Sequence, residues 1–434
     1  MAKSKRRMSE KQAGYLMVFP ALLIILVIAI WPVVRSFWIS LYDVRLNDPT
    51  KSQIHSAYGI DMERYANGLP LLKSNIANEK KQVEAPAAGE LDAVLQSVLA
   101  VDKELNQDPK FTDRYTQVDD LLNNMQPVPD DVKFLDAEQV QAQKLKDTLQ
   151  DAEKKVLALS NDKQLKTENV LGIVRGLEGS VIEPNFVGLA YYKQYLTDSR
   201  MWASLGNTVL FTVLSVVCEL VLGLWIAVLI NKQFIGRGLV RAAVLIPWAI
   251  PTVISALMWK FMYDGQNGIL AHVFWKIGLI SDPGVLLTTK WGAMFSTIFA
   301  DVWKTTPFMA LLLFAGLQTI PESLYEAAEV DGATKRQQFF RITLPMLKTS
   351  ILVALLFRTL DAFRVFDLVY VLTGGGPANS TETISIYAYK TMFAQMNFGA
   401  GSALSVLVFL CVALISMGYI KILGADLIGE NSGK

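Results

Sequence analysis

Residues 15–39 read YLMVFPALLIILVIAIWPVVRSFWI, and the chain carries no charge between Lys11 and Arg35. About 20 apolar residues are enough for a helix to cross a bilayer. A cleavable signal peptide would have a shorter apolar region and a small-residue cleavage site, whereas this run continues through Trp31. We therefore expect a retained membrane helix, with the N-terminus in the cytoplasm because basic residues precede it. These basic residues are Lys3, Lys5, Arg6, Arg7 and Lys11.

The composition supports a membrane protein. Of 434 residues, 52% are hydrophobic and only 19% are charged, against about a quarter charged in an average soluble protein. Two cysteines rule out a disulfide scaffold. A net charge of +1 argues against nucleic acid as a partner. The sequence therefore predicts an all-α polytopic membrane protein.

Five further apolar runs follow the first, so that we expect six transmembrane helices. They occupy residues 205–231, 241–263, 291–317, 349–373 and 400–423. Basic residues gather in the loop between spans two and three and in the loop between spans four and five. The rule that cytoplasmic loops are positively charged places both loops, both termini and the tail at 425–434 inside the cell. These loop residues are Lys232, Arg237, Arg241, Lys335, Arg336, Arg341 and Lys348.

Residues 44–184 form a long polar insertion between spans one and two, which this topology places outside the membrane. Residues 43–200 hold 26 acidic and 19 basic residues and thus have a net charge of −7, whereas the rest of the chain has a net charge of +8. Apolar residues recur at helical spacing within 91–99, 115–125 and 140–159. We expect an α-helical bundle with Met125 and Val140 on its apolar faces. Its role is either to dock an external partner or only to stabilise itself.

The loop after span four reads EAAEVDGATKRQQFFRITLP over residues 326–345. Glu326-Ala-Ala-Glu-Val favours a helix, and Gly332 is a natural residue for a helix stop where the chain reverses. A helix, a Gly turn and a second helix would make a rigid knob that fits a cleft in a moving partner. An ordinary positively charged loop is the alternative, but it would not need Gly332 or the acidic residues.

This loop resembles the EAA signature of the permease subunits of ATP-binding-cassette importers. The segments 316–321, 372–377 and 186–189 with Tyr195 are typical of the carbohydrate branch of that family. The resemblance covers about 10–42 and 184–424 and implies a permease core at 185–424, preceded by a first helix within 1–43. In layout the chain is similar to the larger permease of maltose-type importers, although the extra N-terminal helices and β-rich insertion of that permease are not evident. The resemblance assigns ATPase coupling to Glu326, Ala327, Ala328, Asp331, Gly332, Phe339 and Pro345.

The resemblance also implies the partners. The chain has no G-x-x-x-x-G-K-[ST] sequence, so we expect a separate ATPase to use ATP and Mg, and this chain to be a transport subunit without cofactor or metal. The expected partners are a second homologous permease, two ATPase subunits, an extracytoplasmic sugar-binding protein and membrane lipid. The expected location is the plasma membrane of a bacterium or archaeon.

Charged residues inside the predicted spans are candidates for the transport path, because such residues are costly in a membrane. Asp301 and Lys304 lie three apart on one helix face, where they could pair, whereas Glu219 is isolated on span two and is interpreted as structural. A sugar path needs hydrogen-bonding groups together with aromatic rings. Spans four and five supply both, and several of these positions match sugar-facing ones by resemblance. The candidates are Trp303, Lys304, Thr305, Phe308, Arg358, Asp361, Arg364 and Val365.

Several functions remain open at this point. The favoured substrate is a di- or oligosaccharide of the maltose, maltodextrin or trehalose type. An importer of glycerol phosphate would suit the cations Lys304, Arg358 and Arg364. An ion-driven secondary carrier or a membrane sensor is a more distant alternative. The intramembrane charges could also form only internal salt bridges between spans four and five.

Overall fold

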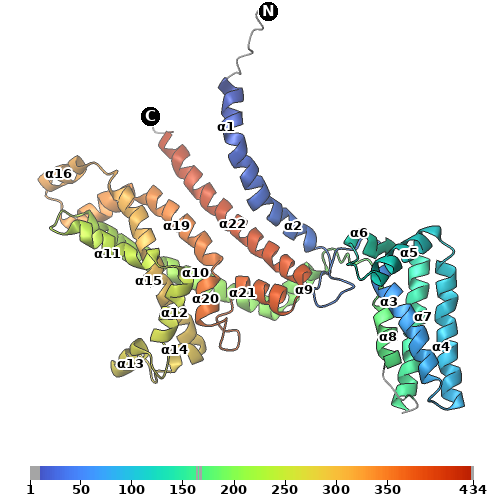
Figure 1. The fold of residues 1–434 in the computed structure, drawn as a ribbon. Helices are drawn as coiled ribbons and strands as arrows, with labels where there is room; N and C mark the ends of the chain where they lie inside the picture. Colours follow the sequence, from blue (N-terminus) through green and yellow to red (C-terminus); the bar gives the residue numbers. More distant parts are fainter. Residues whose placement is uncertain (1–9, 163–164, 166–168, 432–434) are drawn as a thin grey trace, which may run out of the picture. The chain divides into compact units, whose positions relative to one another are not determined.

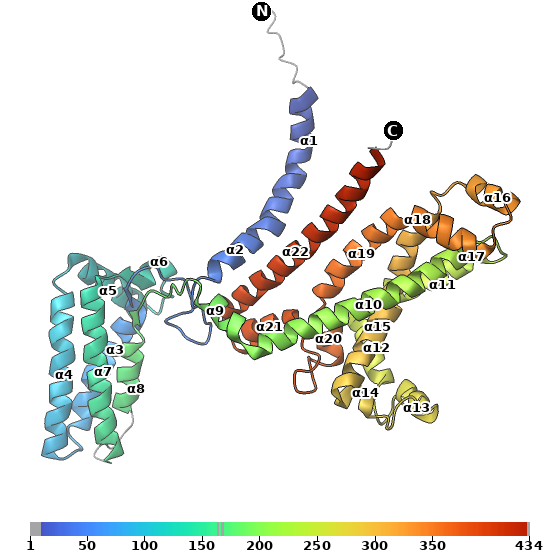
Figure 2. The same cartoon turned by 180° about the vertical axis from the view of Figure 1, so that it is seen from behind.

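The computed structural model describes residues 10–162, 165 and 169–431, so Lys3, Lys5, Arg6 and Arg7 lie outside the described residues. The chain is mainly helical and divides into two compact units (Figures 1 and 2). The first unit comprises Met1–Leu189 with Met396–Ala400, and the second comprises Ala190–Gln395 with Gly401–Lys434.

The first unit begins with an apolar helix of three consecutive segments. These are α1 (Glu10–Ile25), the π-helical η1 (Leu26–Ile30) and α2 (Trp31–Ile39). Together they give the run Gly14–Ile39, which is long and apolar enough to cross a membrane and has no buried residue in its most apolar window. The wide π turn lies immediately before Pro32, which has no N–H to donate to the preceding helical turn.

Residues 62–178 of the first unit form a helical bundle. The predicted amphipathic segments lie within α4, α5 and α7, and the apolar face of α3 joins them in one buried core. Met125 and Val140 were wrongly predicted to be in this core, since both side chains are exposed. Met125 has a positive φ of 53° just beyond the end of α5, so the helical spacing no longer applies there. The helices are α3 (Met62–Glu79), α4 (Ala85–Leu105), α5 (Pro109–Asn123), α6 (Asp130–Lys133), α7 (Gln139–Asn161) and α8 (Asn169–Glu178).

A small antiparallel sheet lies at one end of this bundle. β1 (Gly59–Asp61) pairs with β2 (Phe134–Asp136) and with β3 (Val181–Ile182), so that Ile60 opposes both Leu135 and Val181. The two ends of the insertion also meet, because the Asp43 N–H donates to the Asn185 carbonyl at 2.7 Å. The bundle therefore starts and ends at residues that are far apart in the sequence but neighbours in space.

The second unit is built around two long helices, α10 (Ser199–Asn231) and α15 (Lys290–Leu317). They approach closely at Gly223, where a Cβ would lie 2.7 Å from the Met309 Cγ. A third long helix, α22, runs over Phe398–Asn431 and thus continues into the predicted tail. Short helices connect these elements: α9 (Ala190–Thr197), α13 (Ile269–Lys276), α14 (Val285–Thr288), α16 (Glu322–Val330), α17 (Lys335–Gln338), η2 (Phe339–Thr343) and α18 (Leu344–Met346).

The third and fifth predicted spans are broken, contrary to the expectation of continuous helices. α11 (Arg237–Ala249) and α12 (Thr252–Met262) meet at an angle of 90°. Ile250 between them is extended, with φ −73° and ψ 132°, because it precedes Pro251. The described residues contain four helices long and apolar enough to cross a membrane, or up to six if each bent pair is one span.

The predicted fifth span stops early. α19 (Lys348–Phe363) is followed by a break, by α20 (Asp367–Leu372) and by a Gly-rich turn at 373–383. The chain then returns through α21 (Ile384–Tyr389) and the π-helical η3 (Lys390–Ala394). We name the segment 367–394 the outer hairpin.

Candidate functional site

A cavity of about 530 Å³ lies where the break between α11 and α12 meets the middle of α15 and the end of α19. Six of the predicted path residues line it: Lys304, Thr305, Arg358, Asp361, Arg364 and Val365. Phe308 lines a second pocket of about 240 Å³, which shares Trp248, Thr305, Arg358, Asp361 and Arg364 with the first. The structure thus brings together residues from three predicted spans.

Trp303 is the predicted path residue that lines neither cavity. Its ring packs edge-on against Trp259, with centroids 5.3 Å apart, in an apolar cluster that also contains Tyr263. Trp303 is adjacent to Lys304 on α15, and successive helical residues point about 100° apart. The structure therefore places Trp303 in this cluster, whereas its neighbour lines the cavity, and a role for Trp303 in the path stays a prediction.

The guanidinium of Arg358 joins three helices through carboxylates. It donates to Glu219 of α10 at 2.5 and 2.7 Å and to Asp301 of α15 at 3.0 Å. It also donates to Asp361, one turn along α19, at 2.7 Å. Arg358 is 2% exposed, so its guanidinium is buried while it pairs with three carboxylates. The interpretation of Glu219 as isolated was wrong, since its partner lies 139 residues away.

Lys304 does not form the predicted pair with Asp301. Its Nζ donates instead to the carbonyl of Ile250 at 2.6 Å, across the break between α11 and α12. A broken helix leaves backbone carbonyls without intrahelical partners, and these groups must be satisfied within a membrane. Asp301 is paired with Arg358, so the internal salt bridges proposed as the alternative are present as part of the cavity wall.

An aromatic pair stands beside the charged cluster. Trp248 and Phe308 stack with centroids 5.8 Å apart and an interplanar angle of 24°. The Thr305 hydroxyl lies near them, 2.7 Å from Glu219. Sequence reasoning missed Trp248, although Pro247 and Pro251 within one apolar run were a signal that the span is interrupted there. The cavity therefore offers flat apolar rings together with polar groups.

The predicted knob is present at residues 322–338. α16 ends at Val330 and is soon followed by Gly332, which has a φ of 78°. The Gly332 N–H donates to the Glu329 carbonyl at 3.0 Å, and the Ala333 N–H donates to the Ala328 carbonyl at 2.8 Å. This pair of bonds is the Schellman motif, in which Gly tolerates the left-handed backbone. A capping box between Thr334 and Gln337 then starts α17. The predicted helix, Gly turn and second helix are thus confirmed.

The knob is exposed and internally braced. α16 has no buried residue, and the proposed coupling residues are exposed except for Ala328 and Phe339, which are partly buried. An ion pair with Lys335 spans the turn and holds the pKa of Glu329 below its ordinary value. The Tyr325 and Thr343 hydroxyls are hydrogen-bonded at 2.9 Å, which fixes α16 against the end of η2. The knob can therefore move as one body.

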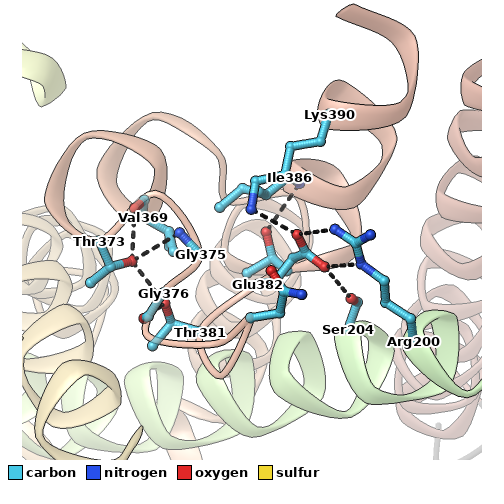
Figure 3. Close-up of polar contacts among 12 residues, drawn as sticks. Arg200, Ser204, Val369, Thr373, Gly375, Gly376, Thr381, Glu382, Ile386 and Lys390 are labelled. Atoms are coloured by element: carbon cyan, nitrogen blue, oxygen red, sulfur yellow. Dashed lines mark hydrogen bonds and ion pairs between the residues drawn. The ribbon is translucent and has the colours of Figure 1, made fainter. Parts of the chain in front are cut away.

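Glu382 anchors the turn of the outer hairpin (Figure 3). Its carboxylate accepts hydrogen bonds from Arg200 at 2.8 and 2.9 Å and from Lys390 at 2.9 Å. Burial raises the pKa of Glu382, but the two cations outweigh burial and leave the pKa below its ordinary value. At the neighbouring Gly375, with φ 86°, a Cβ would lie 3.2 Å from both Glu382 and Lys390. The turn is thus closely packed onto α10.

Comparison with known proteins gives consistent matches. The family described as binding-protein-dependent transport system inner membrane component matches residues 219–428. The trehalose/maltose transport system permease protein MalF of Thermococcus litoralis is 47% identical over 240 residues, which make up 55% of this chain and 80% of that protein. The trehalose transport system permease protein SugA of Mycobacterium tuberculosis is 46% identical over 250 residues, or 57% of this chain and 79% of that protein.

A solved structure shares the fold. A chain from the crystal structure of a bacterial alginate ABC transporter, in complex with an alginate pentasaccharide-bound periplasmic protein, matches with a TM-score of 0.50. The match covers 55% of this chain and 83% of that chain at 23% sequence identity, and therefore concerns the fold alone.

Proposed function

The chain belongs to the family of binding-protein-dependent transport system inner membrane components, the permease subunits of ATP-binding-cassette importers, and we propose that its substrate is a neutral di- or oligosaccharide. It is a transport subunit rather than an enzyme. The relatives MalF and SugA are named as trehalose/maltose and trehalose permeases, which supports this class of sugar.

The hydrogen-bond partners of the cations in the cavity support the proposal of a neutral substrate. Arg358 already donates to three carboxylates, and Lys304 donates to the Ile250 carbonyl. Arg364 lies 3.6 Å from Asp361. An anion would have to displace the three carboxylates before it could bind the guanidinium of Arg358. Glycerol phosphate, the alternative that the sequence left open, is therefore disfavoured.

The stacked rings of Trp248 and Phe308 supply the second element of a sugar site. Aromatic rings offer a flat apolar surface, while the carboxylates and Thr305 accept or donate hydrogen bonds. Ligand sites combine such an apolar lining with a few placed polar groups. We assign the path to Lys304, Thr305, Phe308, Arg358, Asp361, Arg364 and Val365, with Trp248 added.

We propose a six-span topology in which α11 and α12 together form the third span and α19 forms the fifth. The basic loops then lie in the cytoplasm together with both termini, as the positive-inside rule requires. The insertion at 44–184 lies outside, and its adjacent ends at Asp43 and Asn185 allow it to interrupt the chain between spans one and two. The permease core is 185–424, and 425–434 forms the cytoplasmic tail.

The knob at 322–338 docks in a cleft of an ATPase subunit that uses ATP and Mg. Its exposed surface and rigid Gly turn support this role. The contact residues in the knob are Glu326, Ala327, Ala328, Asp331 and Gly332, and Phe339 and Pro345 beyond it extend the contact. The complete importer would hold a second permease, two ATPase subunits and an extracytoplasmic sugar-binding protein, and would lie in the plasma membrane of a bacterium or archaeon.

Uptake competition tests the substrate class. Cells that carry the complete importer are given radiolabelled trehalose or maltose, with unlabelled neutral sugar or glycerol phosphate as competitor. Unlabelled sugar should abolish uptake, whereas glycerol phosphate in the same excess should leave it unchanged. ATP-dependent uptake of glycerol phosphate without uptake of either sugar would overturn the proposal.

A further inference from the structure

Four aromatic rings form a continuous series on the outer hairpin and the residue before it. The Phe366 ring lies 5.2 Å from that of Tyr370 and 4.9 Å from that of Tyr389, measured between centroids. Tyr370 and Tyr389 are 5.1 Å apart, and the Phe393 ring lies 4.9 Å beyond Tyr389. We name Phe366, Tyr370, Tyr389 and Phe393 the aromatic ladder.

One end of the ladder is in the cavity already described. Phe366 lines the cavity of about 530 Å³ together with Arg364, Val365 and Asp367. The other rings lie on α20, α21 and η3, at the end of α19 opposite to the knob at α16 (Figure 1). Tyr370 is 41% exposed and Phe393 is 52% exposed. The ladder thus runs from the cavity away from the knob, and part of its ring surface is exposed.

The hairpin that carries the rings is held at several points. The Thr373 and Thr381 hydroxyls are hydrogen-bonded at 2.7 Å across the turn, where Figure 3 shows both residues. The Thr383 hydroxyl donates to the Val365 carbonyl at 3.3 Å, which connects the start of α21 to the cavity wall. Glu382 links the hairpin to Arg200 of α10 and to Lys390 of η3. Rings held in this way need little reordering when a ligand binds.

The ladder has the chemistry of a sugar surface and not of an anion or metal site. Flat rings accept the apolar faces of sugar rings, and the tyrosine hydroxyls supply hydrogen-bonding groups at their edges. From the geometry we infer that the aromatic ladder is a second sugar subsite, along which a neutral oligosaccharide passes into the cavity. This inference rests on the proposed function, since it takes the same class of substrate.

The test measures uptake of radiolabelled maltose and maltotriose by cells that carry the complete importer. Tyr370→Ala, Tyr389→Ala and Phe393→Ala should each lower uptake at low sugar concentration by roughly two- to tenfold, the range expected for one aromatic contact. The loss should be larger for the trisaccharide, which spans more of the ladder. Tyr389→Phe and Phe393→Tyr should restore most of the uptake because they keep the ring.

Phe261→Ala is the matched control, because Phe261 is 64% exposed but belongs to neither the ladder nor the cavity. The amount of assembled importer is measured for every variant by co-purification of its subunits. Normal uptake of both sugars by all three alanine variants would refute the role of the aromatic ladder as a sugar subsite. A loss of uptake that only matches a loss of assembled importer would overturn it as well and assign the rings to a subunit interface. Absence of sugar uptake in the unmodified importer would instead refute the proposed function.

Discussion

Substitution of Arg358 by Met removes the cation that three carboxylates share, while keeping most of the side-chain volume. The hydrogen bonds to Glu219, Asp301 and Asp361 are lost together. Asp361 is 57% exposed and can be hydrated, whereas Glu219 and Asp301 are buried. The variant therefore leaves two buried carboxylates without a cation.

The expected destabilisation is large. Removal of one partner from a buried ion pair costs about 3–5 kcal/mol, because a charge remains that neither water nor protein compensates. For a domain of roughly this size, 1 kcal/mol corresponds to about 2–4 °C in melting temperature. Arg358→Met should therefore lower the apparent melting temperature by about 6–20 °C.

Glu219→Gln provides the contrast that isolates the cause. Arg358 then keeps Asp301 and Asp361, and the amide oxygen can still accept a hydrogen bond, so the expected loss is about 1–2 kcal/mol. Arg364→Met should change stability by less than about 1 kcal/mol, since Arg364 is an exposed cation.

The assay follows tryptophan fluorescence of the purified, detergent-solubilised importer during heating, with the unmodified importer as reference. The decisive result is the order of the three variants. If Glu219→Gln lowers the melting temperature as much as Arg358→Met does, the buried charge balance does not determine the stability of this cluster.

Three further predictions concern other parts of the chain. A Cβ at Gly332 would have no atom within 4 Å, so the cost of Gly332→Asp comes from the φ of 78° and from the added charge and is about 1–3 kcal/mol. Sugar uptake and co-purification of the ATPase should both fall in this variant. Normal values of both would refute the coupling role of the knob. Phe308→Ala should lower sugar uptake roughly two- to tenfold while Phe308→Tyr retains it, and equal uptake by the two variants would exclude ring stacking at this position. Gly223→Leu should cost about 1–3 kcal/mol in stability through contact with Met309, whereas Gly206→Leu on the same helix has open space around it and should be neutral in the same melting assay.

Local signals in the sequence were sufficient for much of the architecture. The long apolar runs predicted α10 and α15, because the length needed to cross a bilayer is a property of one segment. Helical spacing predicted α4, α5 and α7 of the bundle for the same reason. The pattern failed at Met125, where a single residue with positive φ ends the helical periodicity. It also failed to show the break at Ile250, although Pro251 marked the place.

The knob and six of the residues that line the cavity were likewise predicted from the sequence. Gly332 and the acidic run before it specify a turn within a few residues, so no distant contact is needed. Residues one turn apart, such as Arg358 and Asp361, share one helix face and pair as their spacing suggests.

By itself, the sequence determined the apolar segments, the exposed knob and the types of residue available to the path, since all of these depend on neighbours along the chain. Only the tertiary structure decided which charges meet. Arg358 pairs with Glu219 across 139 residues, and Lys304 turns to the Ile250 carbonyl instead of to Asp301. A charge inside a membrane protein must find some partner, but helix packing selects which one. The same packing sets the Phe366 ring against that of Tyr389, and this long-range contact has no signature in the local sequence.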